Sequence, residues 1–497
     1  MYIKCMATKI ITPEDQAFFS LVSEAVFANP FSQQRAELNR KMSSGSTNAP
    51  LCDMVSEVVR EVNRRIGKLD ADGLAKIQDF KPVDRCLIEH VFLFDVFHRS
   101  IEQFDQLIID QIASDEKPIT VHFAKDCLSI LINRGFSPHL ANRYFSLFYQ
   151  IRRTFYFIDR SLIGQSNSMT LFRQNLWNNI FTHDIGYYER YLWDKMEDFS
   201  TLLLGPTGSG KGAAAAAIGR SGFIPFDEKK QTFAESFTKT FIPINLSQYA
   251  ENLLESELFG HTKGAFTGAV ESHDGVFGLC GPHGSIFLDE IGDVSIQIQI
   301  KLLKILEERI FSPVGSHKQL HFHGRIIAAT NQPLEQLRLN GKFRDDFYYR
   351  LCSDCIIIPS LQQRIQENPS ELDELIAHSV ERITGYKAED LICTVKEVIG
   401  KNLGKDYHWP GNVRELAQCI RRVAIKRDYA GDVTVAHGDL KTKLFTEIDS
   451  GKLNAQDLLS AYCTILYQRH GTYEQVASMT QLDRRTVKKH IEHFSTL

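Results

Sequence analysis

A glycine-rich loop between an apolar run and an alanine-rich run most constrains how this chain can fold. Leu202–Leu204 predicts a buried strand, Ala213–Ile218 predicts a helix, and between them lie Gly205, Pro206, Thr207, Gly208, Ser209, Gly210 and Lys211. Such a loop binds phosphate groups, because its backbone N–H groups and the N-terminus of the following helix point toward the anion. The order strand, loop, helix therefore predicts a nucleotide-binding α/β fold in which Lys211 reaches the β- and γ-phosphates.

Four more apolar runs extend this unit into a sheet. They are Phe241–Ile244, Ile286–Leu288, Arg325–Ala329 and Cys355–Ile358, and helical patterns separate them. Continuous apolar strands that alternate with helices are typical of a parallel sheet covered by helices on both faces. The centre of the chain is therefore predicted to be a parallel-sheet α/β domain.

Two acidic residues follow one of these strands directly. Asp289 and Glu290 come after Ile286–Leu288, at the carboxyl end of a buried parallel strand, which is where such sheets bind their ligands. Asp289 is expected to hold Mg²⁺ directly or through water, and Glu290 to act as general base on the attacking water. Acidic residues also occur at strand ends without a chemical role. The pair therefore indicates a catalytic site only in combination with the phosphate-binding loop.

Helical patterns flank the α/β domain on both sides. Residues 1–160 carry apolar side chains at helical spacing, for example Val55, Val58, Val62 and Ile66, and the pattern returns over residues 365–440. Ser137 and Pro138 predict the start of a helix. A chain of 497 residues is long enough for two to four domains of roughly 100–200 residues each.

The composition is ordinary for a soluble globular protein. The net charge is -4, so any contact with nucleic acid must come from a local basic patch. No signal peptide and no uninterrupted apolar run of about 18 residues is recognisable, so no membrane span is expected. The 10 cysteines are scattered, as in a reduced compartment.

The most specific signal is the segment Glu257–Ala269, which reads ELFGHTKGAFTGA. Further motifs are FLDEIG at 287–292, AATN at 328–331, RDDFYYR at 344–350 and WPGNVREL at 409–416. In this order they resemble the AAA+ domain of bacterial enhancer-binding proteins, which activate sigma-54 RNA polymerase. The resemblance runs from Leu162 to Leu416 and implies a P-loop AAA+ domain at 161–365 and a helical lid at 366–445, after a helical regulatory domain at 1–160.

The resemblance also implies roles for single residues. Asn331 matches the sensor of the γ-phosphate, Asn245 the switch residue that restrains the catalytic glutamate, and Arg414 the lid arginine that senses the nucleotide. Arg344 and Arg350 match arginine fingers that reach the nucleotide of the neighbouring subunit. Because a finger supplied in trans contributes about 10³–10⁵ in rate, the resemblance implies a ring oligomer, in the family usually a hexamer.

The GAFTGA loop has features that fit a moving contact surface. Gly264 and Gly268 permit unusual backbone angles, and Phe266 is a large apolar side chain on an expected exposed loop. From the residues alone, Phe266 is equally compatible with packing against its own domain. In the family this loop, here Gly264, Phe266, Thr267 and Gly268, touches sigma-54 and couples hydrolysis to remodelling.

The chain departs from the family pattern at two places. Gly212 follows the P-loop lysine, where the family usually has Glu and the general motif has a Ser/Thr that commonly holds Mg²⁺. The stretch Pro359–Arg364 reads PSLQQR in place of the usual PLRER. We expect the first change to weaken the handling of ATP and Mg²⁺, and the second to alter the geometry of the lid.

The tail at 452–497 predicts an all-α helix-turn-helix unit. Thr472 and Gln475 fit a capping box of a first helix, and Asp483 is expected to cap a second. The second helix would expose four basic residues, namely Arg484, Arg485, Lys488 and Lys489. A solvated basic helix is the plain alternative, but the unit resembles the Fis-type domain of enhancer-binding proteins, whose arginines read guanine edges while lysines hold phosphates.

Together these features predict a regulator that binds double-stranded DNA and remodels sigma-54 RNA polymerase into the open complex by hydrolysing ATP. A rival hypothesis, favoured by Gly212, is a DNA-binding regulator that uses ATP only as an assembly ligand. A generic unfoldase would leave the GAFTGA loop and the basic tail unexplained. Residues 1–160 are expected to sense a signal or bind a partner and so to restrain ring assembly.

Overall fold

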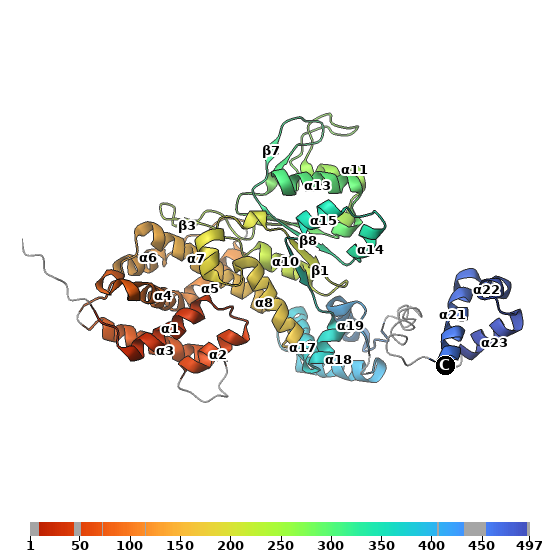
Figure 1. Ribbon diagram of the computed structural model, residues 1–497, viewed down its shortest axis with the longest axis horizontal. Coiled ribbons are helices and arrows are strands. Elements are labelled where there is room, and N and C mark those ends of the chain that lie inside the picture. The colour runs from red at the N-terminus through yellow and green to blue at the C-terminus, as the bar shows by residue number, and fades with distance from the viewer. Residues whose placement is uncertain are drawn as a thin grey trace, which may run out of the picture. The chain divides into compact units, whose positions relative to one another are not determined.

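The computed structural model describes residues 9–43, 51–71, 73–114, 116–404, 407–431 and 454–494 (Figure 1). Residues 44–50 and residues 432–453, which include the connection from the lid to the tail, lie outside these ranges. The chain forms two compact units, one of Met1–Gly385 with Gly411–Leu416 and one of Tyr386–Pro410 with Ala417–Leu497. No helix of the described part of the chain is long and apolar enough to cross a membrane.

The first unit contains a five-stranded parallel sheet in the order β4-β5-β8-β1-β9. Its strands are β1 (Thr201–Leu204), β4 (Phe241–Asn245), β5 (Ser285–Asp289), β8 (Arg325–Thr330) and β9 (Asp354–Ile357). Each matches a predicted strand within one residue at either end, so the α/β fold class is confirmed. β1 lies between β8 and β9, which places the loop that follows it at the carboxyl edge of the sheet.

Side chains of successive strand residues enter two different cores. Leu203, Ile327 and Ile356 belong to one cluster of buried residues, and Leu202, Ile326 and Ala328 belong to the other. Such alternation buries both faces of the sheet, as a parallel sheet requires. The covering helices are α8 (Asn167–Phe181), α10 (Lys211–Gly219), α11 (Glu251–Phe259), α12 (Val276–Leu279), α13 (Ile296–Glu308), α14 (Leu334–Leu339) and α15 (Asp345–Leu351).

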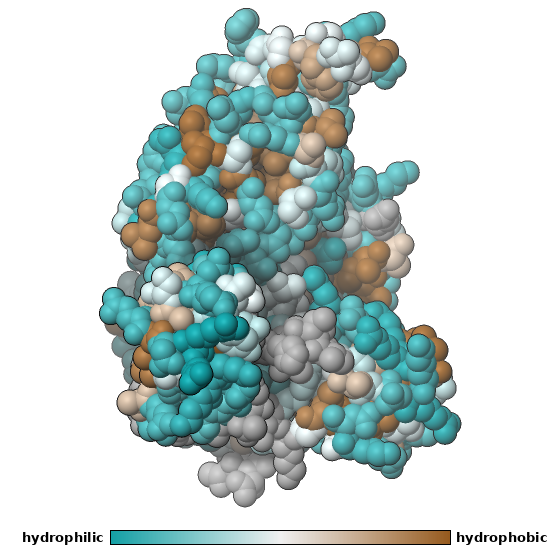
Figure 2. Space-filling view, turned by 90° about the vertical axis from the view of Figure 1, so that its right-hand side faces the viewer, coloured by the Kyte–Doolittle hydropathy of each residue, from teal (hydrophilic) through white to brown (hydrophobic). Residues whose placement is uncertain are grey.

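Two short antiparallel ribbons and several single turns complete the domain. The ribbons are β2 (Phe226–Asp227) with β3 (Thr232–Phe233), and β6 (Ile310–Phe311) with β7 (Leu320–His321). The turns are α9 (Ile185–Tyr187), η2 (Tyr188–Leu192), η3 (Met196–Asp198), η4 (Leu246–Gln248) and η5 (Ile291–Asp293). The surface seen in Figure 2 is mainly hydrophilic, with apolar residues in small separate groups.

The N-terminal residues are helical, as predicted. The helices are α1 (Pro13–Phe27), α2 (Gln33–Met42), α3 (Leu51–Leu69), α4 (Pro82–Arg99), α5 (Ile101–Ala113), α6 (Ala124–Asn133) and α7 (Pro138–Ser161), with a short turn η1 (Ile77–Asp79). Ser137 caps α7 as expected, because its hydroxyl accepts a hydrogen bond from the N–H of Leu140 at 3.3 Å.

Helix α7 packs directly on the α/β domain. The ring of Phe145 contacts Phe104 of α5 on one side and Phe226 of β2 on the other, with ring centroids 5.5 and 4.9 Å apart. Tyr149 stacks on Phe233 of β3 at 4.0 Å. One buried apolar cluster therefore runs from the N-terminal helices through α7 to the sheet.

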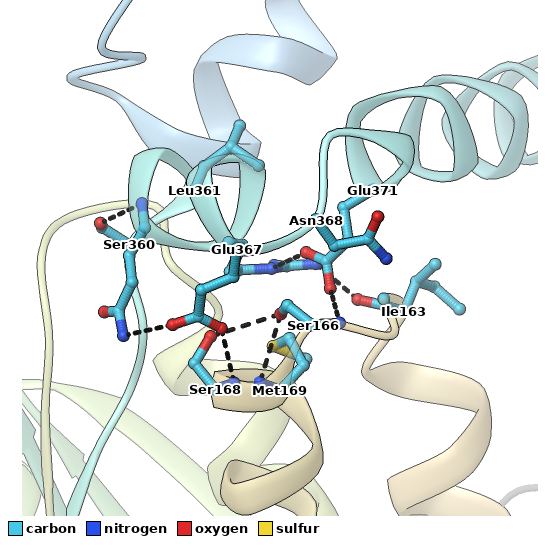
Figure 3. A network of polar contacts seen from close by, with 12 residues as sticks. Ile163, Ser166, Ser168, Met169, Ser360, Leu361, Glu367, Asn368 and Glu371 are labelled. Atoms are coloured by element: carbon cyan, nitrogen blue, oxygen red, sulfur yellow. Dashed lines mark hydrogen bonds and ion pairs between the residues drawn. The ribbon is translucent and has the colours of Figure 1, made fainter.

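A buried polar network joins the connector between α7 and α8 to the helices after β9 (Figure 3). Those helices are α16 (Leu361–Glu367) and α17 (Ser370–Thr384). Arg364 pairs with Glu371 at 2.7 Å, and both side chains are almost fully buried. Arg364 also donates to the carbonyl of Ile163, while Glu371 accepts from the N–H of Ser166 at 2.7 Å. The altered stretch Pro359–Arg364 thus contributes Arg364, which ties the connector to α17.

The second unit contains α18 (Glu389–Asn402), most of α19 (Asn412–Lys426), α21 (Ala455–His470), α22 (Tyr473–Thr480) and α23 (Arg484–Phe494). The last three helices share a small core of Cys463, Leu466, Val476, Val487 and Ile491.

The packing of α7 predicts the outcome of a truncation at the expected domain boundary. A chain that starts at Ser161 would lose α7 and leave the aromatic rings of Phe226, Phe233 and Phe237 facing water. We expect this fragment to aggregate, because large apolar patches are not tolerated on soluble monomers. The soluble fraction and the binding of a hydrophobic dye measure this. A well-behaved fragment with native thermal stability would contradict the role of α7 in the core.

Candidate nucleotide-binding site

The predicted phosphate-binding loop joins β1 to α10 at the carboxyl edge of the sheet. Gly208 and Gly210 have φ angles of +76° and +111°, in the left-handed region that favours glycine. A Cβ atom on Gly208 would lie 2.2 Å from the carbonyl oxygen of Gly411. The loop is therefore shaped both by its own backbone and by the segment before α19, which rests against it.

Lys211 is the first residue of α10 and folds back over the loop. Its Nζ donates to the carbonyls of Gly205 and Pro206 at 3.0 and 3.4 Å. Burial lowers the pKa of Lys211, and the opposing effect of the nearby Glu290 and Asp289 is smaller. A phosphate group would offer this buried cation the counter-charge that carbonyl oxygens only partly supply.

Asp289 and Glu290 lie at the same edge, at the end of β5. Burial raises the pKa of both carboxyl groups, and Lys211 opposes the shift in each. Glu290 has a φ of +58°, and its Oε2 is buried without a hydrogen-bond partner. A strained backbone and an unsatisfied buried oxygen are costly, and they mark this residue as a functional candidate.

The acidic pair suits a divalent cation bound together with phosphates. Mg²⁺ is usually held by one or two carboxylates plus phosphate oxygens, and the unpartnered Oε2 of Glu290 and the carboxylate of Asp289 are hard oxygen donors. Gly212 supplies no hydroxyl to such an ion. A Cβ atom on Gly212 would meet nothing within 4 Å, so packing does not require a glycine there.

The structure brings Asn331 to the P-loop but turns Asn245 toward its own chain neighbour. Asn331 Nδ2 donates to Thr207 Oγ1 at 2.7 Å, and its backbone N–H donates to Glu290. Asn245 lies next to Asp289 in the β4–β5 register, but its Oδ1 accepts from the N–H and the hydroxyl of Ser247. Asn331 therefore joins the loop to Glu290, whereas Asn245 lies one strand away.

Arg414 and its neighbour Asn412 close the site from the start of α19. Arg414 lies near both Lys211 and Asp289. Its positive charge adds to the lowering of the pKa of Lys211 and opposes the rise in the pKa of Asp289. Asn412, with a φ of +51°, donates to the carbonyl of Thr207 at 3.0 Å and accepts from the N–H of Leu361 at 2.8 Å. Asn412 was not predicted as a site residue, although its place two residues before Arg414 was the available signal.

The two predicted arginine fingers point elsewhere in the single chain. Arg344 is the N-cap residue of α15 and forms a two-pronged pair with Asp346, with N–O distances of 3.0 and 2.6 Å. Arg350 is exposed and donates to the carbonyl of Leu306 at 2.9 Å. Within the described chain neither side chain bonds to a residue of the P-loop.

The GAFTGA loop is exposed and closed by backbone hydrogen bonds. The N–H of Gly264 donates to the carbonyl of Ala269 at 2.8 Å, and Gly264 and Gly268 both have positive φ angles. Phe266 is 40% exposed and meets the ring of His261 edge-on at 5.0 Å. Phe266 is therefore only partly packed against its own domain.

The basic residues of the tail lie on one short helix. Arg484, Arg485, Lys488 and Lys489 are exposed on α23, and Asp483 caps this helix as predicted, accepting from the N–H groups of Arg485 and Thr486. The predicted capping box of α22 is wrong. Thr472 is the N-cap residue, but its hydroxyl donates to Gln475 Oε1 at 3.0 Å and caps no backbone N–H.

A family model matches the central part of the chain. Residues 190–356 match the family model described as the Sigma-54 interaction domain. The chain is 37% identical over 225 residues to the transcriptional regulatory protein GlrR of Escherichia coli, covering 45% of this chain and 46% of GlrR. It is 41% identical over 226 residues to the Nif-specific regulatory protein of Azotobacter vinelandii, covering 46% and 40% of the two chains.

Among solved structures, NtrX from Brucella abortus is similar over 75% of this chain and 80% of its own, with 20% sequence identity and a TM-score of 0.40. The present chain spans less than half of the length of the two curated relatives. The residues matched by the family model, 190–356, include β1, the phosphate-binding loop, Asp289 and Glu290.

The environment of Glu290 predicts how its amide analogue behaves. Because the folded pKa is raised, the ionised carboxylate destabilises the fold above that pKa, and this cost disappears as the pH falls. Glu290→Gln should therefore keep or raise the melting temperature at neutral pH while slowing nucleotide hydrolysis by about 10²–10⁴-fold. For the unaltered protein, the acid limb of hydrolysis should lie above the ordinary glutamate pKa of about 4.3. Circular dichroism and phosphate release measure these effects; a lowered melting temperature in the variant would contradict the assignment.

Proposed function

We propose that this chain, whose residues 190–356 match the Sigma-54 interaction domain, is an ATP-driven activator of sigma-54 RNA polymerase. The protein would bind DNA, assemble into a ring and use ATP hydrolysis to remodel the polymerase into the open complex. We place this activity in the bacterial cytoplasm. The observation that carries the proposal is the convergence of Lys211, the acidic pair and Asn331 at one edge of the sheet.

ATP binding is assigned to the loop Gly205–Gly212, with Arg414 above it. The backbone N–H groups of the loop and the N-terminus of α10 would surround the phosphates, and Lys211 would exchange its carbonyl partners for β- and γ-phosphate oxygens. Asp289 would hold Mg²⁺, which when bound neutralises charge on the phosphate oxygens. Arg414 would report the nucleotide through its position on α19.

Hydrolysis is assigned to Glu290, positioned by its neighbours. The buried Oε2 lacks a partner and is available to accept a proton from water. Asn331 contacts both Thr207 and Glu290, so it can link the state of the γ-phosphate to the catalytic carboxylate. Asn245 would act on Glu290 only after its amide leaves Ser247.

Assembly would complete the site. Arg344, the N-cap residue of α15, and Arg350 within this helix are at least partly exposed, so they are available to reach the nucleotide of an adjacent subunit. Arg344 would have to exchange Asp346 for a phosphate. A ring, by family analogy a hexamer, supplies the finger in trans and makes hydrolysis depend on protein concentration.

Two exposed elements would connect the motor to its partners. The loop with Gly264, Phe266, Thr267 and Gly268 presents a partly exposed aromatic ring to sigma-54. The helix α23 would enter the major groove of an upstream DNA site with its four basic residues. The control of assembly is assigned to the N-terminal helices.

A second candidate function follows from Gly212. Without a hydroxyl at this position the protein would use ATP as an assembly ligand and not hydrolyse it productively. Phosphate release measured at rising protein concentration separates the two functions. Turnover that rises with concentration supports the motor, and its absence together with ATP-dependent assembly supports the alternative.

The exposed threonine of the loop tests the coupling step. Among the described residues Thr267 makes no side-chain hydrogen bond, so Thr267→Ala disturbs no contact within the chain. We expect this variant to retain ATP turnover within about twofold but to lose open-complex formation on a sigma-54 promoter. Lys211→Ala should lose ATP turnover as well while keeping DNA binding. Normal transcription by Thr267→Ala would exclude the coupling role.

Substitutions in the tail test DNA binding. Arg485 is exposed on α23, and Arg469 is an exposed arginine on α21, so the two alanine variants change the charge equally. We expect Arg485→Ala to weaken binding to a duplex selected by the unaltered protein by about 1–3 kcal/mol, and Arg469→Ala to have little effect. Fluorescence anisotropy over a range of salt concentrations measures both. Equal losses would point to unspecific attraction and contradict the assignment of α23.

A further inference from the structure

A buried arginine of α7 binds the end of the P-loop helix. Arg153 is fully buried, and its Nη1 and Nη2 donate to the carbonyls of Arg220 and Gly222 at 2.9 and 2.7 Å. Arg220 is the C-cap residue of α10, whose N-terminus carries Lys211. The rings of Tyr149 and Phe237 flank the guanidinium at 4.4 and 5.6 Å.

Burial of the Arg153 guanidinium costs free energy that an apolar side chain at the same position would not cost. Arg153 forms no ion pair within the described chain, burial lowers its pKa to about 10, and its Nε has no partner. A buried cation is often replaced by an apolar residue without loss of stability, so packing does not explain an arginine here. Its partners are carbonyls at the negative end of a helix dipole, which specifically favours a cation.

Helix α10 itself has few features that would fix its position. Apart from Lys211 and Ile218 it consists of alanine and glycine, which pack closely but interlock little. Contacts at the two ends of α10 therefore contribute strongly to fixing its position. At the C-terminal end Gln150 of α7 donates to the carbonyl of Ser221 at 2.9 Å, beside the two hydrogen bonds of Arg153.

Ser221, Gly222 and Phe223 line a cavity of about 430 Å³, together with Gln150. On the side of the sheet, Ser285 of β5 donates to the carbonyl of Gly219 at 2.9 Å. Polar contacts from α7 and from β5 therefore hold this end of α10, and those from α7 reach the turn that lines the cavity.

We infer that Arg153 is a positioning residue for the nucleotide site: by fixing the C-terminal end of α10 it sets the position of Lys211 and the P-loop. The inference rests on the proposed ATP binding. The helix of nine residues is about 13 Å long and transmits a shift of one end to the other. The next residue, Arg152, pairs with Asp105 of α5 at 2.5 Å, so two adjacent arginines attach α7 to the N-terminal helices and to the nucleotide site.

The two arginines provide a matched comparison. Arg153→Met leaves a shorter apolar side chain and removes both hydrogen bonds to the turn, and Arg153→Lys keeps the charge and one donor position. Arg152→Met removes the pair with Asp105 and the contact with the ring of Phe155. For each full-length variant we would measure the dissociation constant of a fluorescent ATP analogue with Mg²⁺, KM and kcat of ATP hydrolysis, the melting temperature, and hydrogen exchange of residues 211–222.

We expect Arg153→Met to weaken nucleotide binding and kcat/KM by about 10–100-fold, since displacements of about 1 Å are known to cost this much. Arg153→Lys should recover part of the loss, and exchange in residues 211–222 should be faster in both. Arg152→Met should remain within about twofold of the unaltered protein in binding, even where it lowers the melting temperature.

Several results would overturn the inference. Unchanged binding and exchange in Arg153→Met would do so, and so would equal losses in Arg152→Met, which would reduce the effect to stability. If Arg153→Met is insoluble, unchanged binding and exchange in Arg153→Lys decides against it. If the unaltered protein binds no ATP, the proposed function fails, whereas faster exchange of residues 211–222 in the Arg153 variants would still show that Arg153 holds α10.

Discussion

The attachment of α10 at both of its ends is the constraint on which the site depends. At one end Gly208 and Gly210 adopt backbone angles that favour glycine, and Lys211 covers the loop. At the other end Arg153 holds the carbonyls that follow the helix. The alanine-rich helix between these two attachments is stiff, and its small side chains interlock little with neighbouring residues. The phosphate-binding loop therefore inherits its position from the N-terminal helices as well as from the sheet.

The acidic edge shows how the fold gives up stability for chemistry. Glu290 combines a left-handed backbone, a buried oxygen without a partner and a pKa raised by burial. Each of these opposes folding, and each suits a carboxylate that must take a proton from water. The surrounding β-strands are tightly paired, with β5 between β4 and β8, and so they can sustain this local cost.

The remaining candidate residues are at least partly exposed, and within the described part of one chain they make no contact with the nucleotide-binding site. Arg344 is held by Asp346, Phe266 is partly packed on His261, and the basic side chains of α23 face water. This distribution fits a division of labour in which the buried site binds and hydrolyses a nucleotide and the surface elements meet other subunits, polymerase and DNA. The connector between α7 and α8 binds α16 and α17 through the buried network of Arg364 and Glu371. Together with the packing of α7, this gives the N-terminal helices two separate contacts with the rest of the first unit.

The sequence by itself determined the local elements: five strands, the P-loop with its lysine, the acidic pair at a strand end and the cap of α23 by Asp483. These depend on side-chain periodicity and on hydrogen bonds between near neighbours. Only the tertiary structure decided that Arg153 binds a carbonyl 69 residues away and that Asn412 binds one 205 residues away. Such contacts depend on how whole helices pack, and no local pattern of residues encodes that packing.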